Sequence, residues 1–215
     1  MNKFFDPDGT FAHIMNIVLA LILLNVCWIL CSLPIFTMGA ATASLYTVLI
    51  KMRDGDDTKV VRRFFAAFRE NFKRGTAVWL ALLLAAAVCG LDLYFANRLD
   101  SNAARVIALV GMVAVAMAAE SAFILVARFE NTWKEHLKNA LLLSLSCTPR
   151  ALLALVLWGG MVALTFFSFN TMYIMIMLWL MAGFSCLSYA TLWIFSPALK
   201  KLEPAPAEEE EAEEM

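Results

Sequence analysis

Charged residues are scarce in this sequence. Only 16% of its 215 residues are Asp, Glu, Lys or Arg, whereas 62% are hydrophobic and the mean hydropathy is +0.74. A soluble globular domain carries about 25% charged residues. The composition therefore excludes an ordinary soluble domain and indicates a chain that crosses a membrane several times. We expect no nucleic-acid partner.

Residues that build common catalytic and metal sites are also few. Besides His13 the chain has only His136, with no second histidine within ligand spacing, and its five cysteines form no CxxC pair. The motifs GxxxxGK[ST], HExxH and GxSxG do not occur. We therefore predict no metal site, no cofactor and no catalytic residue, and we interpret the protein as not an enzyme.

Long uncharged runs fill most of the chain. A helix needs about 20 apolar residues to cross a membrane, and the run from Phe11 to Ile50 is long enough for two spans. It is broken at Pro34, which disfavours helix at the residue before it. We predict one all-α domain at 1–202, a polytopic transmembrane helix bundle of six spans at 11–32, 35–51, 76–97, 103–128, 151–169 and 171–196. The span 35–51 is short, and a re-entrant segment, which would leave five spans and move the N-terminus outside, stays open.

Basic residues give the predicted orientation. The segment Lys51–Arg74 holds eight of the seventeen Lys and Arg residues, and with six spans only Arg98 and Arg105 fall on the opposite side. Lys and Arg beside membrane spans stay preferentially in the cytoplasm. The sequence therefore predicts a multi-pass protein of the cell membrane with both termini in the cytoplasm. The glutamate-rich tail, 203–215, is predicted to be disordered.

Two segments on the cytoplasmic side are predicted to be amphipathic interfacial helices, at 58–74 and 132–147. In the first, phenylalanines fall on one face and basic residues on the other, which suits a helix lying on the anionic inner leaflet or a docking surface for a partner. In the second, Thr132 and Glu135 have the spacing of a capping box. The candidate partner or membrane-interface residues are Arg62, Arg63, Phe64, Phe65, Phe68, Phe72, Phe129, Trp133 and Leu137.

Glu120 is an acid placed deep in the span 103–128, about 12 Å from the inner end at 1.5 Å per residue. A charge at this depth is costly, so it indicates either a hydrogen-bonded structural acid or part of an ion or proton path. Because no Lys, Arg or His lies deep within a span to relay a proton, we favour the structural role. Asn25 is the candidate hydrogen-bond partner.

Three stretches resemble the YesL family of bacterial integral membrane proteins: LNVCWILCSLPIFTMGAATASLYTVL at 24–49, RFFAAFRENFKRG at 63–75 and ARFENTWKEHLKNALLL at 127–143. The most specific elements of the resemblance contain Asn25, Trp28, Pro34, Thr37 and Gly39. Members of this family are commonly encoded beside carbohydrate ABC importers. The resemblance therefore implies an accessory or scaffold role with such an importer, whose permease subunits are the expected partners, and it carries over no catalytic residue.

Three functions stay open. The leading hypothesis is a non-enzymatic accessory subunit associated with a carbohydrate ABC importer, seated in a bilayer with an anionic inner leaflet. The second is a small membrane transporter or channel, in which Glu120 would lie on the transport path. The third is a membrane signalling partner that acts through the two inner helices.

Overall fold

The computed structural model describes residues 10–55 and 59–199. Its elements are α1 (Thr10–Ser32), the 3-10 turn η1 (Ile35–Thr37), α2 (Met38–Arg53), α3 (Val60–Arg98), α4 (Asn102–Arg128), α5 (Trp133–Ser146), α6 (Thr148–Thr165), α7 (Phe169–Leu178), the π-helical segment η2 (Trp179–Gly183) and α8 (Phe184–Leu199). Every regular element of these residues is a helix, so the all-α prediction is confirmed. The tail at 203–215 lies outside the described residues.

Six helical stretches are long and apolar enough to cross a membrane, which confirms the predicted number. They are Ile14–Ser32, Ile35–Arg53, Val60–Arg98, Asn102–Arg128, Thr148–Thr165 and Phe169–Leu199. One difference from the sequence prediction concerns α3, in which the amphipathic segment expected at 58–74 and the span expected at 76–97 form one continuous helix. Gly75 lies within this helix, at a point where the neighbouring helix α2 packs closely against it.

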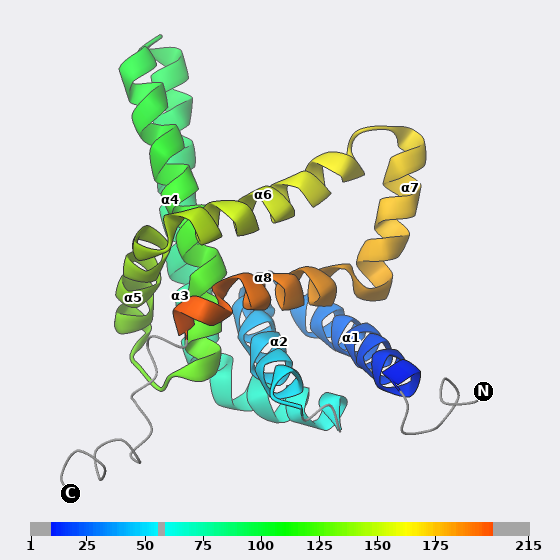
Figure 1. The fold of residues 1–215 in the computed structure, drawn as a ribbon. Coiled ribbons are helices and arrows are strands. Elements are labelled where there is room, and N and C mark those ends of the chain that lie inside the picture. The colour runs from blue at the N-terminus through cyan, green and yellow to red at the C-terminus, as the bar shows by residue number, and fades with distance from the viewer. Residues whose placement is uncertain (1–9, 56–58, 200–215) are drawn as a thin grey trace, which may run out of the picture.

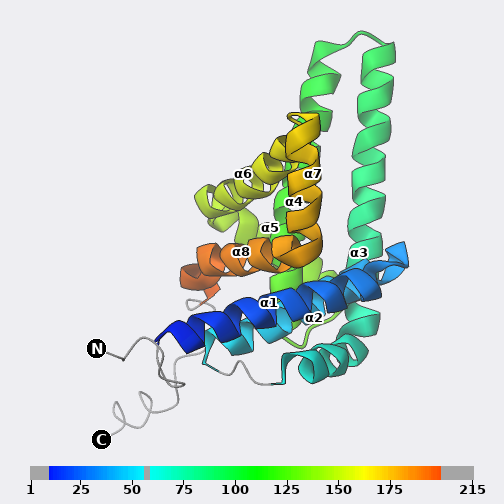
Figure 2. The same cartoon turned by 90° about the vertical axis from the view of Figure 1, so that its right-hand side faces the viewer.

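The candidate spans cross one another and do not run parallel. The helices α3 and α4 form a long antiparallel hairpin whose outer turns stand clear of the rest of the molecule (Figure 1). The helices α1 and α2 pack across the base of this hairpin, and the first turns of α3 lie across the direction of its later part (Figure 2). The helices α6, α7 and α8 run out from α4 and return to α1 (Figure 1).

The helices α2 and α3 approach each other at backbone distance, at Gly39 and Gly75. A Cβ atom on Gly39 would lie 2.3 Å from the carbonyl oxygen of Gly75, and one on Gly75 would lie 2.8 Å from the Cα of Ala40. No side chain fits between the two backbones, so both positions require glycine. About one turn before Gly75 on α3, and about two turns after Gly39 on α2, the Asn71 Nδ2 donates a hydrogen bond to the Thr47 Oγ1 at 3.2 Å. Small and hydroxylated residues of the second span therefore make a close helix contact with α3.

The helix α5 is attached along α4 by a pair of buried serines. The Ser144 Oγ lies 2.9 Å from the Ser121 Oγ and donates to the Met117 carbonyl at 2.8 Å, while the Ser121 Oγ donates to the Ala140 carbonyl at 3.0 Å. The capping box that was predicted at the start of α5 is confirmed. Because Ala140 meets Ser121 and Ser144 meets Met117, α5 runs back beside α4 in the antiparallel direction.

The glycine crossing can be tested by adding one methyl group. We expect Gly39→Ala to lower the thermal unfolding midpoint in detergent by several degrees, because forcing atoms into a packed contact costs about 1–3 kcal/mol. The matched control is Gly159→Ala on α6, where a Cβ atom meets nothing within 4 Å. There the midpoint should stay the same or rise, since alanine favours helix over glycine. Equal midpoints for the two variants would show that the crossing is not tight.

Candidate functional site

The side chain of Asn25 on α1 holds the π-helical segment η2 in place. Its Nδ2 donates to the carbonyl oxygens of Trp179 and Leu180, both at 2.9 Å. Its Oδ1 accepts the backbone N–H groups of Phe184 at 3.1 Å and Ser185 at 3.2 Å. This fully buried amide therefore satisfies backbone groups at a helix irregularity, of a kind that often marks functional sites. The sequence suggested Asn25 as the hydrogen-bond partner of Glu120, but in the structure these two side chains do not pair.

The other residues of the family-like motif shape the turn between α1 and α2. Pro34 follows α1, and the Thr37 Oγ1 lies 2.6 Å from the carbonyl oxygen of Cys31 and 2.7 Å from that of Pro34. Gly39 makes the close approach to α3 described above. Trp28 lies three residues after Asn25, so both side chains share one helix face, and its ring stacks on Phe184 with centroids 4.0 Å apart. The motif is thus a set of packing and hydrogen-bonding positions.

An aromatic cavity of about 350 Å³, which we name the Glu120 chamber, lies where the six candidate spans meet. Its volume is at the lower end of the range of small-molecule sites, about 300–1,000 Å³. Each candidate span contributes at least one lining residue. The aromatic rings of the chamber are Trp28 of α1, Tyr46 of α2, Trp79 of α3, Phe123 of α4, Trp158 of α6 and Phe184 of α8.

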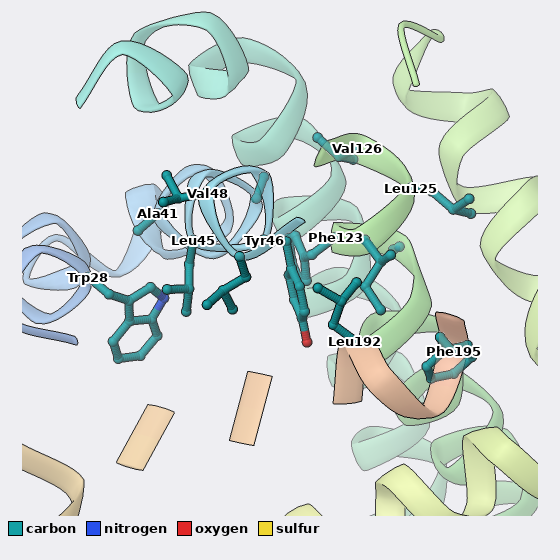
Figure 3. Close-up of a cluster of buried hydrophobic side chains, with 14 of the residues drawn as sticks. Trp28, Ala41, Leu45, Tyr46, Val48, Phe123, Leu125, Val126, Leu192 and Phe195 are labelled. Carbon is teal, nitrogen blue, oxygen red and sulfur yellow. The ribbon is translucent and has the colours of Figure 1, made fainter. Parts of the chain in front are cut away.

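The polar groups of the chamber are few. They are the carboxylate of Glu120, the hydroxyls of Thr42 and Ser188, and the hydroxyl of Tyr46, which interacts with Ser188 and Thr191. Figure 3 shows Tyr46 reaching from α2 toward α8 beside Phe123. The Glu120 Oε2 is buried and has no hydrogen-bond partner among the described residues. The structure therefore contains a carboxylate with one buried oxygen that the described residues leave without a partner.

The interface candidates on α3 fall into two groups. Phe64 is fully buried, and Phe68 is partly buried against the same core. Phe65 and Phe72 are exposed, at 50% and 38%, as is Arg62, while Arg63 is half-buried. The buried face of α3 therefore overlaps only one edge of the arc of rings that the sequence displays. It consists of Val60, Phe64, Ala67, Asn71, Gly75, Val78 and Leu82.

The interface candidates around α5 are divided in the same way. Trp133 is exposed, whereas Phe129 and Leu137 pack partly against the core. The most buried large side chain of α5 is His136, with no exposed surface. Its burial, together with the nearby Arg74 guanidinium, lowers its pKa from the ordinary value of 6.5. No group of three or more side chains that could hold a metal ion occurs in residues 10–55 and 59–199.

Asp92 on α3 is a second acid within a candidate span. It is exposed, on the outer part of the α3–α4 hairpin, six residues before the helix ends at Arg98. Val88, Leu91 and Phe95, which surround it on the helix, are apolar and exposed at 49%, 58% and 57%.

The chamber residues Trp79 and Trp158 could not be recognised from the sequence, because aromatic side chains are common in apolar spans.

Comparison with known proteins gives one match. Residues 21–93 match the family described as "Protein of unknown function, DUF624". The matched part covers α2 and most of α1 and α3, and it includes the Gly39–Gly75 crossing as well as Asn25. No curated protein and no solved structure matches the chain.

Replacing Asn25 tests its role at η2. We expect Asn25→Leu, which keeps the branched shape of the side chain, to lower the thermal unfolding midpoint strongly, because each buried backbone group left unpaired costs about 1–3 kcal/mol. The matched control is Asn16→Leu on the same helix, where the side chain is exposed. Thermal unfolding followed by tryptophan fluorescence would measure both. Similar midpoints for the two variants would contradict the assignment.

The buried His136 predicts that stability falls in mild acid. Because its pKa is lowered in the folded protein, the unfolded chain binds a proton first as the pH drops through 6.5. Below that pH the free energy of unfolding should fall by up to about 1.4 kcal/mol per pH unit until His136 is protonated in the folded state. We expect His136→Leu to remove this dependence between pH 7.5 and 5. An unchanged pH profile in the variant would assign the loss to another group.

Proposed function

We propose that this protein is a non-enzymatic membrane subunit that packs against the permease subunits of a carbohydrate ABC importer through the outer part of its α3–α4 hairpin. The observation that carries the proposal is the exposed carboxylate of Asp92. It lies about 9 Å from the end of α3, at 1.5 Å per residue, and is surrounded by exposed apolar side chains. Charged residues within spans almost always face protein or a water-filled cavity, and rarely lipid. This face of the hairpin therefore suits contact with another protein.

The low burial of several spans supports the same proposal. In the most apolar window of α3 only 11% of the residues are buried, and in Thr148–Thr165 and Phe169–Leu199 the share is 17%. In the second span, Ile35–Arg53, it is 61%. The second span is thus largely covered by other helices of the chain. The outer hairpin, α6 and α7 instead leave most of their side chains exposed. Such a division suits a subunit that completes its packing against a larger membrane protein.

The identity of the partner rests on the resemblance to the YesL family, whose members are commonly encoded beside carbohydrate ABC importers. The match at 21–93 contains the two quoted stretches at 24–49 and 63–75 and is consistent with that resemblance. The orientation follows from the basic residues. We place the basic end of the hairpin in the cytoplasm, where Arg62 and Lys73 are exposed beside Phe65 and Phe72. These four side chains suit attachment to an anionic inner leaflet.

Affinity purification tests the proposal. The tagged full chain, extracted in a mild detergent from its own bacterial host, should retain permease subunits of a carbohydrate ABC importer, identified by mass spectrometry. We expect Asp92→Leu to reduce the retained permease several-fold, because it removes the polar group that a partner would pair. The matched control is Glu130→Gln, an exposed acid at the opposite end of the hairpin. Recovery of the wild-type chain without any permease subunit would overturn the proposal.

A further inference from the structure

We propose that the Glu120 chamber is a binding site for a small organic cation with an alkylated ammonium group. The site does not depend on the docking surface at Asp92, since it lies at the meeting point of all six candidate spans. It combines an acid with aromatic rings on several sides. Aromatic rings with a nearby carboxylate are the groups that recognise alkylated ammonium ions, through attraction between the cation and the ring faces.

The Oε2 atom of Glu120 is buried and has no hydrogen-bond partner among the described residues. If the group is an anion, no Lys, Arg or His among the described residues that line the chamber can pair with it, and burial of an isolated charge is very costly. If it is a neutral acid with the proton on Oε2, this hydroxyl has no acceptor in hydrogen-bond range. The chamber therefore leaves this oxygen without a partner. A bound cation would supply the missing charge.

The three indoles of the chamber have already used their hydrogen-bond donors. The Trp28 Nε1 donates to the Thr42 Oγ1 at 3.1 Å, and the Trp79 Nε1 donates to the Ile35 carbonyl at 2.8 Å. The Trp158 Nε1 donates to the Thr191 Oγ1 at 3.0 Å. A ligand is thus offered ring surfaces and not N–H groups, which disfavours a polyhydroxylated or anionic ligand.

The arrangement of the rings is fixed by contacts far apart in the sequence. Phe184 stacks on Trp28 with centroids 4.0 Å apart and lies 6.4 Å from Trp158. On the other side, Trp79 lies 6.2 Å from Phe123. The Asn25 hydrogen bonds hold the backbone at Phe184, so this ring cannot easily turn away. With few acceptors besides Glu120, the chamber suits an ammonium whose hydrogens are replaced by methyl or other alkyl groups.

Two ligands of equal shape test the role of charge. The full chain is placed in nanodiscs of phosphatidylglycerol, which has no ammonium headgroup, and is titrated calorimetrically with choline and with 3,3-dimethylbutan-1-ol, in which carbon replaces the nitrogen. We expect saturable choline binding, and binding of the neutral alcohol at least tenfold weaker. Equal affinities, or no saturable binding of choline, would overturn the proposal. This comparison uses the unmodified protein and does not depend on the folding of a variant.

Substitution of Glu120 locates the binding. We expect Glu120→Gln, which keeps the shape of the side chain, to weaken choline binding at least tenfold. The matched control, Glu70→Gln on the exposed side of α3, should bind as the wild type does. Wild-type affinity in a folded Glu120→Gln variant, as judged by gel filtration, would exclude the chamber as the site.

A change of lipid composition distinguishes a lipid headgroup from a soluble cation as the source of the ammonium group. Phosphatidylcholine, whose headgroup carries a trimethylammonium group, is added to the nanodiscs, and the choline titration is repeated. A several-fold fall in apparent affinity would assign the site to a choline lipid headgroup, and an unchanged affinity would assign it to a soluble cation. Permease retention is a separate measurement, so failure of either proposal leaves the other intact.

Discussion

The backbone crossing of Gly39 and Gly75 is the contact on which the arrangement of the other helices depends. Because no side chain separates the two helices there, α2 and the middle of α3 have little freedom to slide or rotate. The crossing places Trp79, four residues after Gly75, beside the turn that follows α1, where its indole donates to the Ile35 carbonyl. It also directs Tyr46, on α2, toward the same region as Trp79. Two sides of the chamber therefore follow from one close contact.

The remaining sides of the chamber depend on the irregular helix at η2. A π-helical segment changes the direction in which the following side chains point, and its backbone groups need partners. Asn25 supplies four hydrogen bonds there, and the Ser185 Oγ adds one to the Leu21 carbonyl at 2.7 Å. These bonds join α1 to the start of α8 and bring Phe184 onto Trp28. A polar residue within the first span therefore positions an aromatic one.

Much of the fold could be predicted from composition and spacing, because membrane spans are set by length and apolarity alone. The six spans, the break at Pro34 and the capping box of α5 all follow from local sequence. The face that each helix buries could not be predicted from local sequence. On α3 the rings are exposed at Phe65 and Phe72 and buried at Phe64, because packing selects the face that fits around Gly75.

The chamber itself could not be predicted, because its parts lie far apart in the sequence. Phe184 is more than 150 residues from Trp28, and no periodicity of a single helix reports such a pairing. The partner of Asn25 was missed for a related reason. Sequence reasoning looks for another polar side chain, whereas the amide binds backbone groups that an ordinary α-helix would have paired internally. In the sequence, such a site is indicated by a polar residue that stands in an apolar span without an evident partner. Glu120 and Asn25 are two residues of this kind.

Glu120 and Asp92 illustrate how the position of a carboxylate in a membrane-spanning hairpin decides what it can bind. Glu120 lines a cavity to which all six candidate spans contribute, so its missing partner must be small enough to enter a volume of about 350 Å³. Asp92 lies on the outer turns, where α3 and α4 stand clear of α7 (Figure 1), so a partner of any size can reach it. The same cost of burying a charge in an apolar medium thus favours a small cation at one site and a protein surface at the other. Both sites lie on the α3–α4 hairpin, and the Trp79–Phe123 contact joins its two helices beside Glu120.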